Sequence, residues 1–127
     1  MLINNLSDFD PVYELCEYEP NKLVCRLEIP NLKKESLDIE IVRDNHHILV
    51  VNGEKEESLK DEKILGNSKI KIHSGDIKKG KFQKWIQIGN LIDVIDFESN
   101  EDDEARLSYE NGVLSIFLVR INNGMRK

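Results

Sequence analysis

Hydrophobic and polar residues alternate along several short stretches of the 127-residue chain, which is the pattern of β-strands with one buried face. The stretches with this alternation are 13–17, 22–29, 37–41 and 82–88. In the clearest of them, one face collects Leu23, Cys25, Leu27 and Ile29. Residues 48–51 are instead continuously apolar, which predicts a strand covered on both faces.

The last part of the chain has the pattern of a β-hairpin. Two strand-like stretches within 105–121 are joined by Asn111-Gly112, a dipeptide that tolerates the positive φ angles of a tight turn. The remaining segments have weaker patterns. Residues 32–36 and 59–65 are short helix candidates, residues 90–96 are a predicted turn and connector, and residues 98–104 are a predicted acidic, solvated loop. About seven to nine short strands with polar turns predict an all-β chain folded as a β-sandwich.

A long charged segment, residues 54–81, interrupts the strand pattern. Loops of this length inside a compact domain are usually either functional or disordered. One short alternation, Ile70-Lys71-Ile72, lies within it and has no purpose in a purely solvated loop. We therefore expect a short strand there that reaches a second subunit. The alternative is a disordered loop, because its charge density is high and its apolar content is low.

Composition excludes several classes of function. The formal net charge is -6, which argues against a nucleic-acid surface because phosphate binding needs a basic face. No apolar run approaches the roughly 20 residues of a membrane span. Residues 1–9 lack the basic start and apolar run of a signal peptide. The spacing of Cys16 and Cys25 matches neither a metal site nor a redox pair, so we expect a reduced, cytoplasmic setting.

No pattern in the sequence indicates catalysis. His46 and His47 lie beside Asp44 in a predicted turn, but adjacent strand residues point to opposite faces, so a solvated turn is the better interpretation than a metal site. Cys25 alternates with core residues and is expected to be a small buried hydrophobe. The acidic run 93–104 lacks the spacing of a calcium loop. We predict no enzyme activity, no catalytic residue, no metal and no cofactor.

Five segments in order resemble the α-crystallin domain of the small heat-shock proteins. The closing hairpin, from Ala105 to Gly112-Val113-Leu114, resembles the alanine-to-G-V-L signature of that domain. The other segments are 27–32, like an L-P-G turn, 35–41 and 48–55, like its central strands, and 80–88, like G-x-F-x-R-x-F-x-L-P. The resemblance implies an immunoglobulin-like β-sandwich with a long inter-strand loop that carries a short strand. It divides the chain into a short arm (1–9), the domain (10–121) and a short tail (122–127).

The resemblance implies an ATP-independent holdase, a stress-response chaperone that binds partly unfolded client proteins. The alternatives are a co-chaperone of the CS-domain class and a structural or interaction module without holdase activity. The family's Ile-x-Ile tail motif is missing after the last strand. We therefore expect a homodimer or a small multiple of it, and not a large shell, with no nucleic-acid or membrane partner.

The family pattern also implies two sites. Subunits pair through an exchanged loop strand, which here consists of Lys69, Ile70, Lys71, Ile72 and His73. Lys84 stands where the family commonly has an arginine in the subunit contact, and a lysine cannot reproduce the planar two-pronged bond of arginine. A groove for a client or a neighbour's tail is expected to be lined by Ile39, Ile41, Leu107, Leu114 and Ile116. The simpler interpretation is that these apolar residues fill the core.

Overall fold

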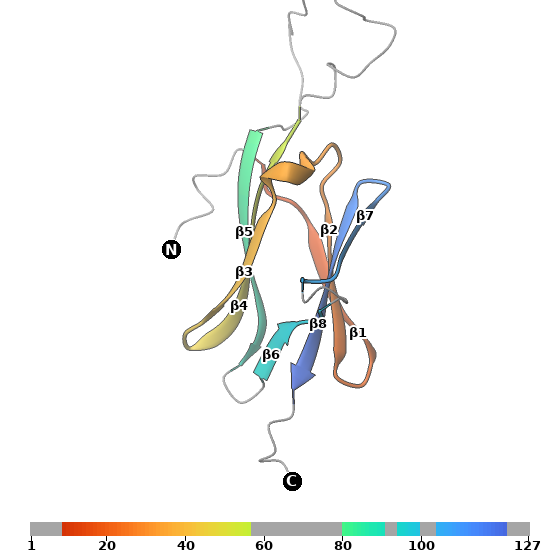
Figure 1. Ribbon diagram of the computed structural model, residues 1–127. Helices are drawn as coiled ribbons and strands as arrows, with labels where there is room; N and C mark the ends of the chain where they lie inside the picture. The colour runs from red at the N-terminus through yellow and green to blue at the C-terminus, as the bar shows by residue number, and fades with distance from the viewer. Residues whose placement is uncertain (1–8, 57–79, 91–93, 100–103, 122–127) are drawn as a thin grey trace, which may run out of the picture.

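Two antiparallel β-sheets face each other in the computed structural model (Figure 1), which describes residues 9–56, 80–90, 94–99 and 104–121. The larger sheet has the order β1-β2-β8-β6, and β7 also pairs with β8. Its strands are β1 (Tyr13–Glu19), β2 (Lys22–Glu28), β6 (Val94–Phe97), β7 (Leu107–Glu110) and β8 (Val113–Ile121). The smaller sheet has the order β3-β4-β5, with β3 (Asp38–Arg43), β4 (His46–Lys55) and β5 (Gly80–Asn90). The predicted all-β sandwich is confirmed.

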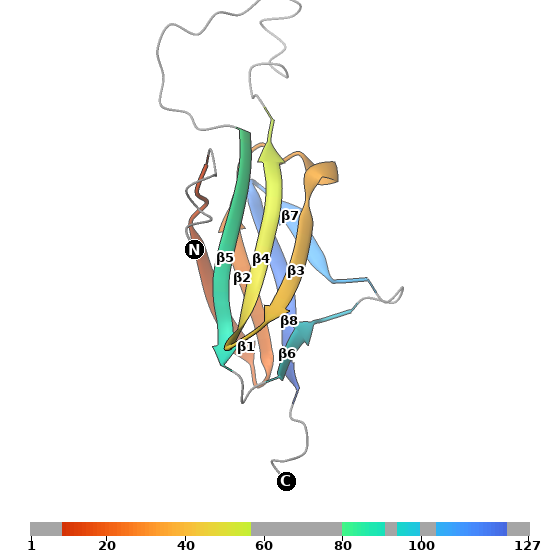
Figure 2. The ribbon, with the colours of Figure 1, turned by 90° about the vertical axis from the view of Figure 1, so that its left-hand side faces the viewer.

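A 3₁₀ turn at Lys34–Ser36, within one of the weak helix candidates, leads into β3. The other candidate, 59–65, and the loop strand predicted at 69–73 lie outside the described residues. In the turned view of Figure 2, the smaller sheet lies in front, with β4 between β5 and β3. Both β3 and β5 are therefore edge strands of that sheet.

The core forms where the inner faces of the two sheets meet, as the alternation predicts. Burial of each large apolar side chain contributes about 1.5–3 kcal/mol to folding. The most deeply buried apolar residues include Cys25, Leu27, Ile29, Leu49, Val51, Ile86, Ile95, Leu114, Ile116 and Leu118. Val50 points away from Leu49 and Val51 and is still only 1% exposed, although no described element lies over that outer face of the sheet (Figure 2). The predicted cover on both faces is therefore absent as a second layer, and Val50 is buried at the centre of its own sheet.

Three sequence expectations need correction. Residues 94–97 form strand β6 rather than a connector, because they pair with the end of β8 and bury Ile95 completely. His47 is 4% exposed within β4 rather than in a solvated turn, because the chain reverses tightly at Asp44, whose amide donates to the His46 carbonyl at 3.0 Å. The Glu98 carboxylate accepts a bond from Arg106 at 2.9 Å and is 19% exposed, so it is not a solvated loop residue.

The closing hairpin turns as predicted. Asn111 and Gly112 have φ angles of 53° and 79°, the two positive values that a type I′ turn requires. The Gly112 carbonyl accepts a bond from the Ile29 amide at 2.8 Å, so the hairpin is fixed to the end of β2. Asn31 takes a φ of 63°, which asparagine tolerates better than most residues.

Candidate functional site

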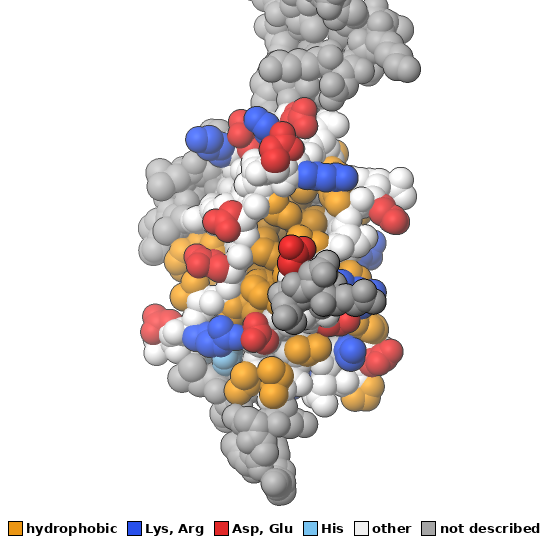
Figure 3. Space-filling model, in the orientation of Figure 1, with side chains coloured by type: hydrophobic (Ala, Val, Ile, Leu, Met, Phe, Trp, Pro, Cys, Tyr) orange, Lys and Arg blue, Asp and Glu red, His pale blue; other side chains and the backbone are white. Residues whose placement is uncertain are grey.

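An open seam between the sheets runs between the β3 edge and the β7 edge. In the orientation of Figure 1, the space-filling view shows a band of hydrophobic side chains between polar margins (Figure 3). The inward-facing residues of β3, together with Leu37 just before it, are half-buried and pack against the core. On the opposite side, Leu107 is 39% exposed and Tyr109 is half-buried. The seam therefore leaves apolar surface open to an extended segment.

The predicted groove residues lie at two depths of this seam. Ile39 and Ile41 lie half-buried on β3, and Leu107 lies on β7 at the other side. Leu114 and Ile116 are 1% and 0% exposed on the inner face of β8, so they are core residues beneath the seam and do not line an accessible groove. For these two residues, the simpler interpretation as core is the one that fits.

Two seam residues were not among the predicted ones. Leu37 and Tyr109 continue the period-two patterns of Ile39 and Leu107, and this signal was enough to find them. The Tyr109 hydroxyl donates to the Ile29 carbonyl at 2.7 Å and accepts from the Leu32 amide at 3.0 Å. These two bonds hold the ring in place at the β7 side of the seam.

The opposite seam, beside β5, is closed by residues 9–11, which run along that edge (Figure 2). Phe9 packs edge-to-face on Phe82, with ring centroids 5.9 Å apart, and Pro11 is fully buried. The Lys55 ammonium lies 4.3 Å from the centroid of the Phe9 ring, and burial lowers the pKa of this lysine. Among the residues that the structure describes, the sandwich thus has one covered seam and one open seam.

Lys84, expected at a subunit contact, interacts within its own chain. Its ammonium lies 2.8 Å from the Asp10 carboxylate and 5.4 Å from the centroid of the Tyr13 ring. Its side chain is only 14% exposed. The exchanged strand that it was expected to accompany, Lys69–His73, lies outside the described residues.

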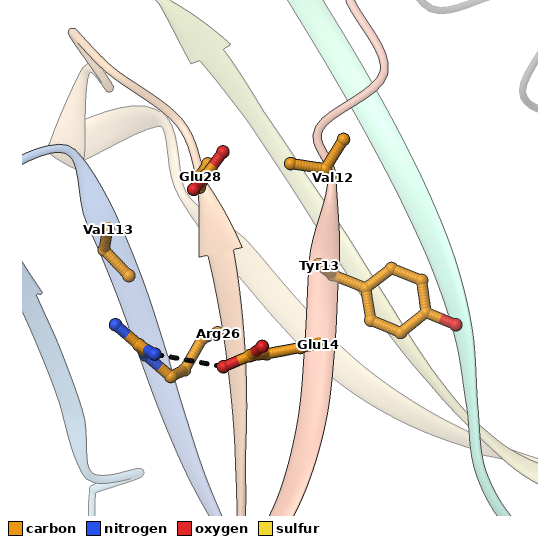
Figure 4. A pocket seen from close by; sticks show the side chains of 6 residues that line it. All are labelled: Val12, Tyr13, Glu14, Arg26, Glu28 and Val113. Atoms are coloured by element: carbon orange, nitrogen blue, oxygen red, sulfur yellow. Dashed lines mark hydrogen bonds and ion pairs between the residues drawn. The ribbon is translucent and has the colours of Figure 1, made fainter.

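The outer face of the larger sheet has a shallow hollow between β1, β2 and β8 (Figure 4). Arg26 and Glu14 face each other across it and form an ion pair at 3.0 Å. Val12 and Tyr13, at the start of β1, are 62% and 47% exposed. Within the described residues β1 pairs only with β2, so its other edge keeps backbone groups available to a further strand.

The reactive side chains of the described residues are arranged without a catalytic geometry. Cys25 is fully buried, and this burial, with a smaller contribution from Cys16, raises the pKa of its thiol to about 12. The His46 Nδ1 lies 3.2 Å from the Gln87 amide nitrogen. Among these residues, no three His, Cys, Asp or Glu side chains are grouped so as to hold a metal ion. Within the same ranges, no helix has the length and apolar character of a membrane span.

Comparison with solved structures shows the same fold in several small heat-shock proteins. HSP18.5 from E. histolytica is 18% identical, with a TM-score of 0.61 over 92% of this chain and 93% of that one. Heat shock protein 16.0 from Schizosaccharomyces pombe is 20% identical, with a TM-score of 0.62 and coverage of 94% of each chain. A small heat-shock protein from Xylella fastidiosa is 23% identical, with a TM-score of 0.52 over 90% of this chain and 88% of that one.

No curated protein sequence matches the chain. The model of the Hsp20/alpha crystallin family matches residues 16–126, which include all of β2 to β8. The closing hairpin and the order of the strands agree with the resemblance found in the sequence. The chain belongs to the Hsp20/alpha crystallin family, that of the small heat-shock proteins.

Proposed function

We propose that this protein is an ATP-independent holdase of the cytoplasm that binds partly unfolded proteins under stress and so prevents their aggregation. The observation that carries this proposal is the open seam between β3 and β7, where apolar side chains remain half exposed. Membership of the Hsp20/alpha crystallin family supports it. Binding of this kind needs no nucleotide and no reacting group.

The seam has the geometry to take an extended segment. Edge strands offer unpaired backbone groups, so a segment lying beside β3 or β7 gains main-chain hydrogen bonds, while alternate side chains enter the seam. Ile39, Ile41 and Leu107 would contact these side chains, together with Leu37 and Tyr109. Leu114 and Ile116 would act from beneath by keeping the floor of the seam apolar.

Replacing Leu107 by serine is expected to weaken protection of a heat-denatured client such as citrate synthase by about tenfold, because one apolar contact of a leucine is lost. The fold should be retained, since Leu107 is 39% exposed. Light scattering of the client at increasing chaperone concentration measures the effect. The matched control is Ile121→Ser, which removes an apolar side chain of similar exposure (45%) at the end of β8.

Equal loss of protection in the two variants would contradict the proposal that clients bind in the seam. A full-length protein that gives no protection at all would instead favour the alternatives, a CS-type co-chaperone or an interaction module. A CS-type co-chaperone would bind a folded chaperone and leave client scattering unchanged.

We further propose a homodimer, or a small multiple of it, in which Lys69–His73 adds as a strand to the open β1 edge of the partner. Deleting residues 56–78 and joining the ends through a short Gly/Ser turn is expected to give a monomer. The ends fit such a turn, because Lys55 and Gly80 are paired neighbours in the β4–β5 ladder.

Light scattering coupled to gel filtration measures the mass of both proteins. The matched control replaces Ile70 and Ile72 by aspartate in the loop of normal length, and it should also be monomeric. A dimer that survives both changes would assign the subunit contact to another surface.

A further inference from the structure

No described element lies over the outer face of the β3-β4-β5 sheet (Figure 2), and the strand register places apolar residues at the centre of this face. The strand register places Glu40, Val50 and Trp85 in one row across the three strands. Val42 and Ile48 lie in the next row, both half-buried. Trp85 is 41% exposed, although indole is among the most costly side chains to leave in water. It points away from Ile86, which lies in the core, so the sandwich itself does not need this ring.

The polar groups around this centre are mostly acidic. Asp38 and Glu40 lie on the same face as Trp85, because the ladder places them opposite Asn52 and Val50 of β4. Glu54 lies on this face as well, four residues after Val50 on β4. Among the described residues of this face, the cation is Lys81, which stands opposite Glu54 in the ladder. The carboxylates near Trp85 therefore outnumber the ammonium groups, and the β3 side of the face is the more negative.

The neighbouring side-chain amides already have hydrogen-bond partners within the sheet. The Gln83 side chain donates to the Asn52 side-chain oxygen at 2.8 Å, and Gln87 lies 3.2 Å from His46 Nδ1. A ligand that binds here would thus meet an indole ring, half-buried aliphatic side chains and carboxylates, with the amide groups engaged elsewhere. This combination favours a ligand in which positively charged groups lie next to apolar groups.

We propose that this face binds an extended peptide segment in which two basic residues flank a short apolar stretch. An arginine of the segment stacks on Trp85, because indole gives the strongest cation–π contact of the aromatic rings. A second basic residue pairs with Glu40 and Asp38. Two strand spacings separate β5 from β3, roughly 10 Å. Basic residues four apart in an extended segment share one face and lie roughly 13 Å apart, so their flexible side chains reach both sites.

This binding is separate from the seam between β3 and β7. Glu40 and Trp85 point to the outer face of their sheet, whereas the apolar side chains of the seam point inward. The Leu107→Ser variant is therefore expected to leave it unchanged. Failure of holdase activity would not affect this proposal, and failure of this proposal would not affect the seam.

The chain contains a single tryptophan, so intrinsic fluorescence reports on Trp85 alone. The probes are two synthetic peptides with the same apolar residues, one reading Gly-Arg-Leu-Val-Leu-Lys-Gly and the other with Glu and Asp in place of Arg and Lys. We expect saturable quenching or a blue shift with the basic peptide and at least tenfold weaker binding of the acidic one. Raising the salt concentration should weaken the basic complex, because exposed charges are screened.

Charge variants of the protein complete the test. Glu40→Gln and Asp38→Asn are each expected to weaken the basic peptide about two- to fivefold, as for exposed ion pairs. The matched control is Glu28→Gln, an exposed carboxylate on β2 of the other sheet, which should leave the affinity unchanged. The Trp85→Thr variant lacks the fluorescent side chain, so its binding is measured by calorimetry. We expect this variant to lose its affinity for the basic peptide.

Three outcomes would overturn the proposal. The first is the same affinity for both peptides, and the second is equal effects of Glu40→Gln and Glu28→Gln. The third is an emission that neither peptide changes, in which case a segment of this chain or a second copy covers the face.

Discussion

Replacing Leu114 or Ile116 by alanine is expected to lower the free energy of unfolding by about 2–5 kcal/mol, the usual cost of a cavity at a core position. These side chains are 1% and 0% exposed on β8, which lies between β2 and the β6 and β7 strands of the larger sheet. Neighbours on both sheets surround them, so the structure has little freedom to close the cavity. Urea denaturation followed by circular dichroism measures the change.

The matched control is Leu107→Ala. Leu107 pairs with Ile116 in the β7–β8 ladder, but it is 39% exposed. It should cost less than about 1 kcal/mol, because little buried surface is lost. The difference between the two losses of stability shows which residues belong to the core and which line the groove. If Leu114→Ala were as mild as Leu107→Ala, Leu114 would be an accessible wall of the seam and not part of the core.

Replacing Gly112 by valine is expected to destabilise the protein by roughly 1–3 kcal/mol, because a β-branched residue is strained at positive φ. Gly112 has a φ of 79°, and an added Cβ would lie 3.4 Å from the Cα of Pro30. The bond from the Ile29 amide to the Gly112 carbonyl would be disturbed as well. Thermal denaturation of both proteins at the same pH measures the loss.

Gly112→Asn is the control for this turn, because asparagine tolerates the left-handed conformation. It should retain most of the stability lost in Gly112→Val. Equal losses in both variants would assign the effect to crowding against Pro30 rather than to backbone strain.

Alternation was enough to predict which residues face inward, but it carried no information on depth. Ile39 and Ile116 follow the same period-two pattern, yet β3 is an edge strand and β8 is an inner one. Strand order, which depends on pairings far apart in the sequence, decides that Ile116 is core and Ile39 is half-buried. The five residues expected to line the groove therefore lie at two depths of the sandwich, and alternation alone could not separate the two groups.

Strand β6 was missed for a related reason. Val94–Phe97 is too short to show a pattern of its own, and it is a strand because the end of β8 pairs with it. The alternation of residues 82–88 indicates that Trp85 points away from Phe82 and Ile86, but it carries no information on what surrounds the ring. Its acidic surroundings depend on the register of three strands, which the sequence does not fix by itself.

The pairing of β2 with β8 has a consequence for how this protein is made. Their ladder joins Lys22 to Val119 and Glu28 to Val113, so it connects opposite ends of the chain. The β3–β4 hairpin is local and can form early, but the larger sheet cannot close before the last strand has been synthesised. Folds with such non-local pairings fold slowly, on the order of milliseconds to seconds. Until then the apolar face of β2 is exposed, and the nascent chain carries the kind of surface that leads to aggregation.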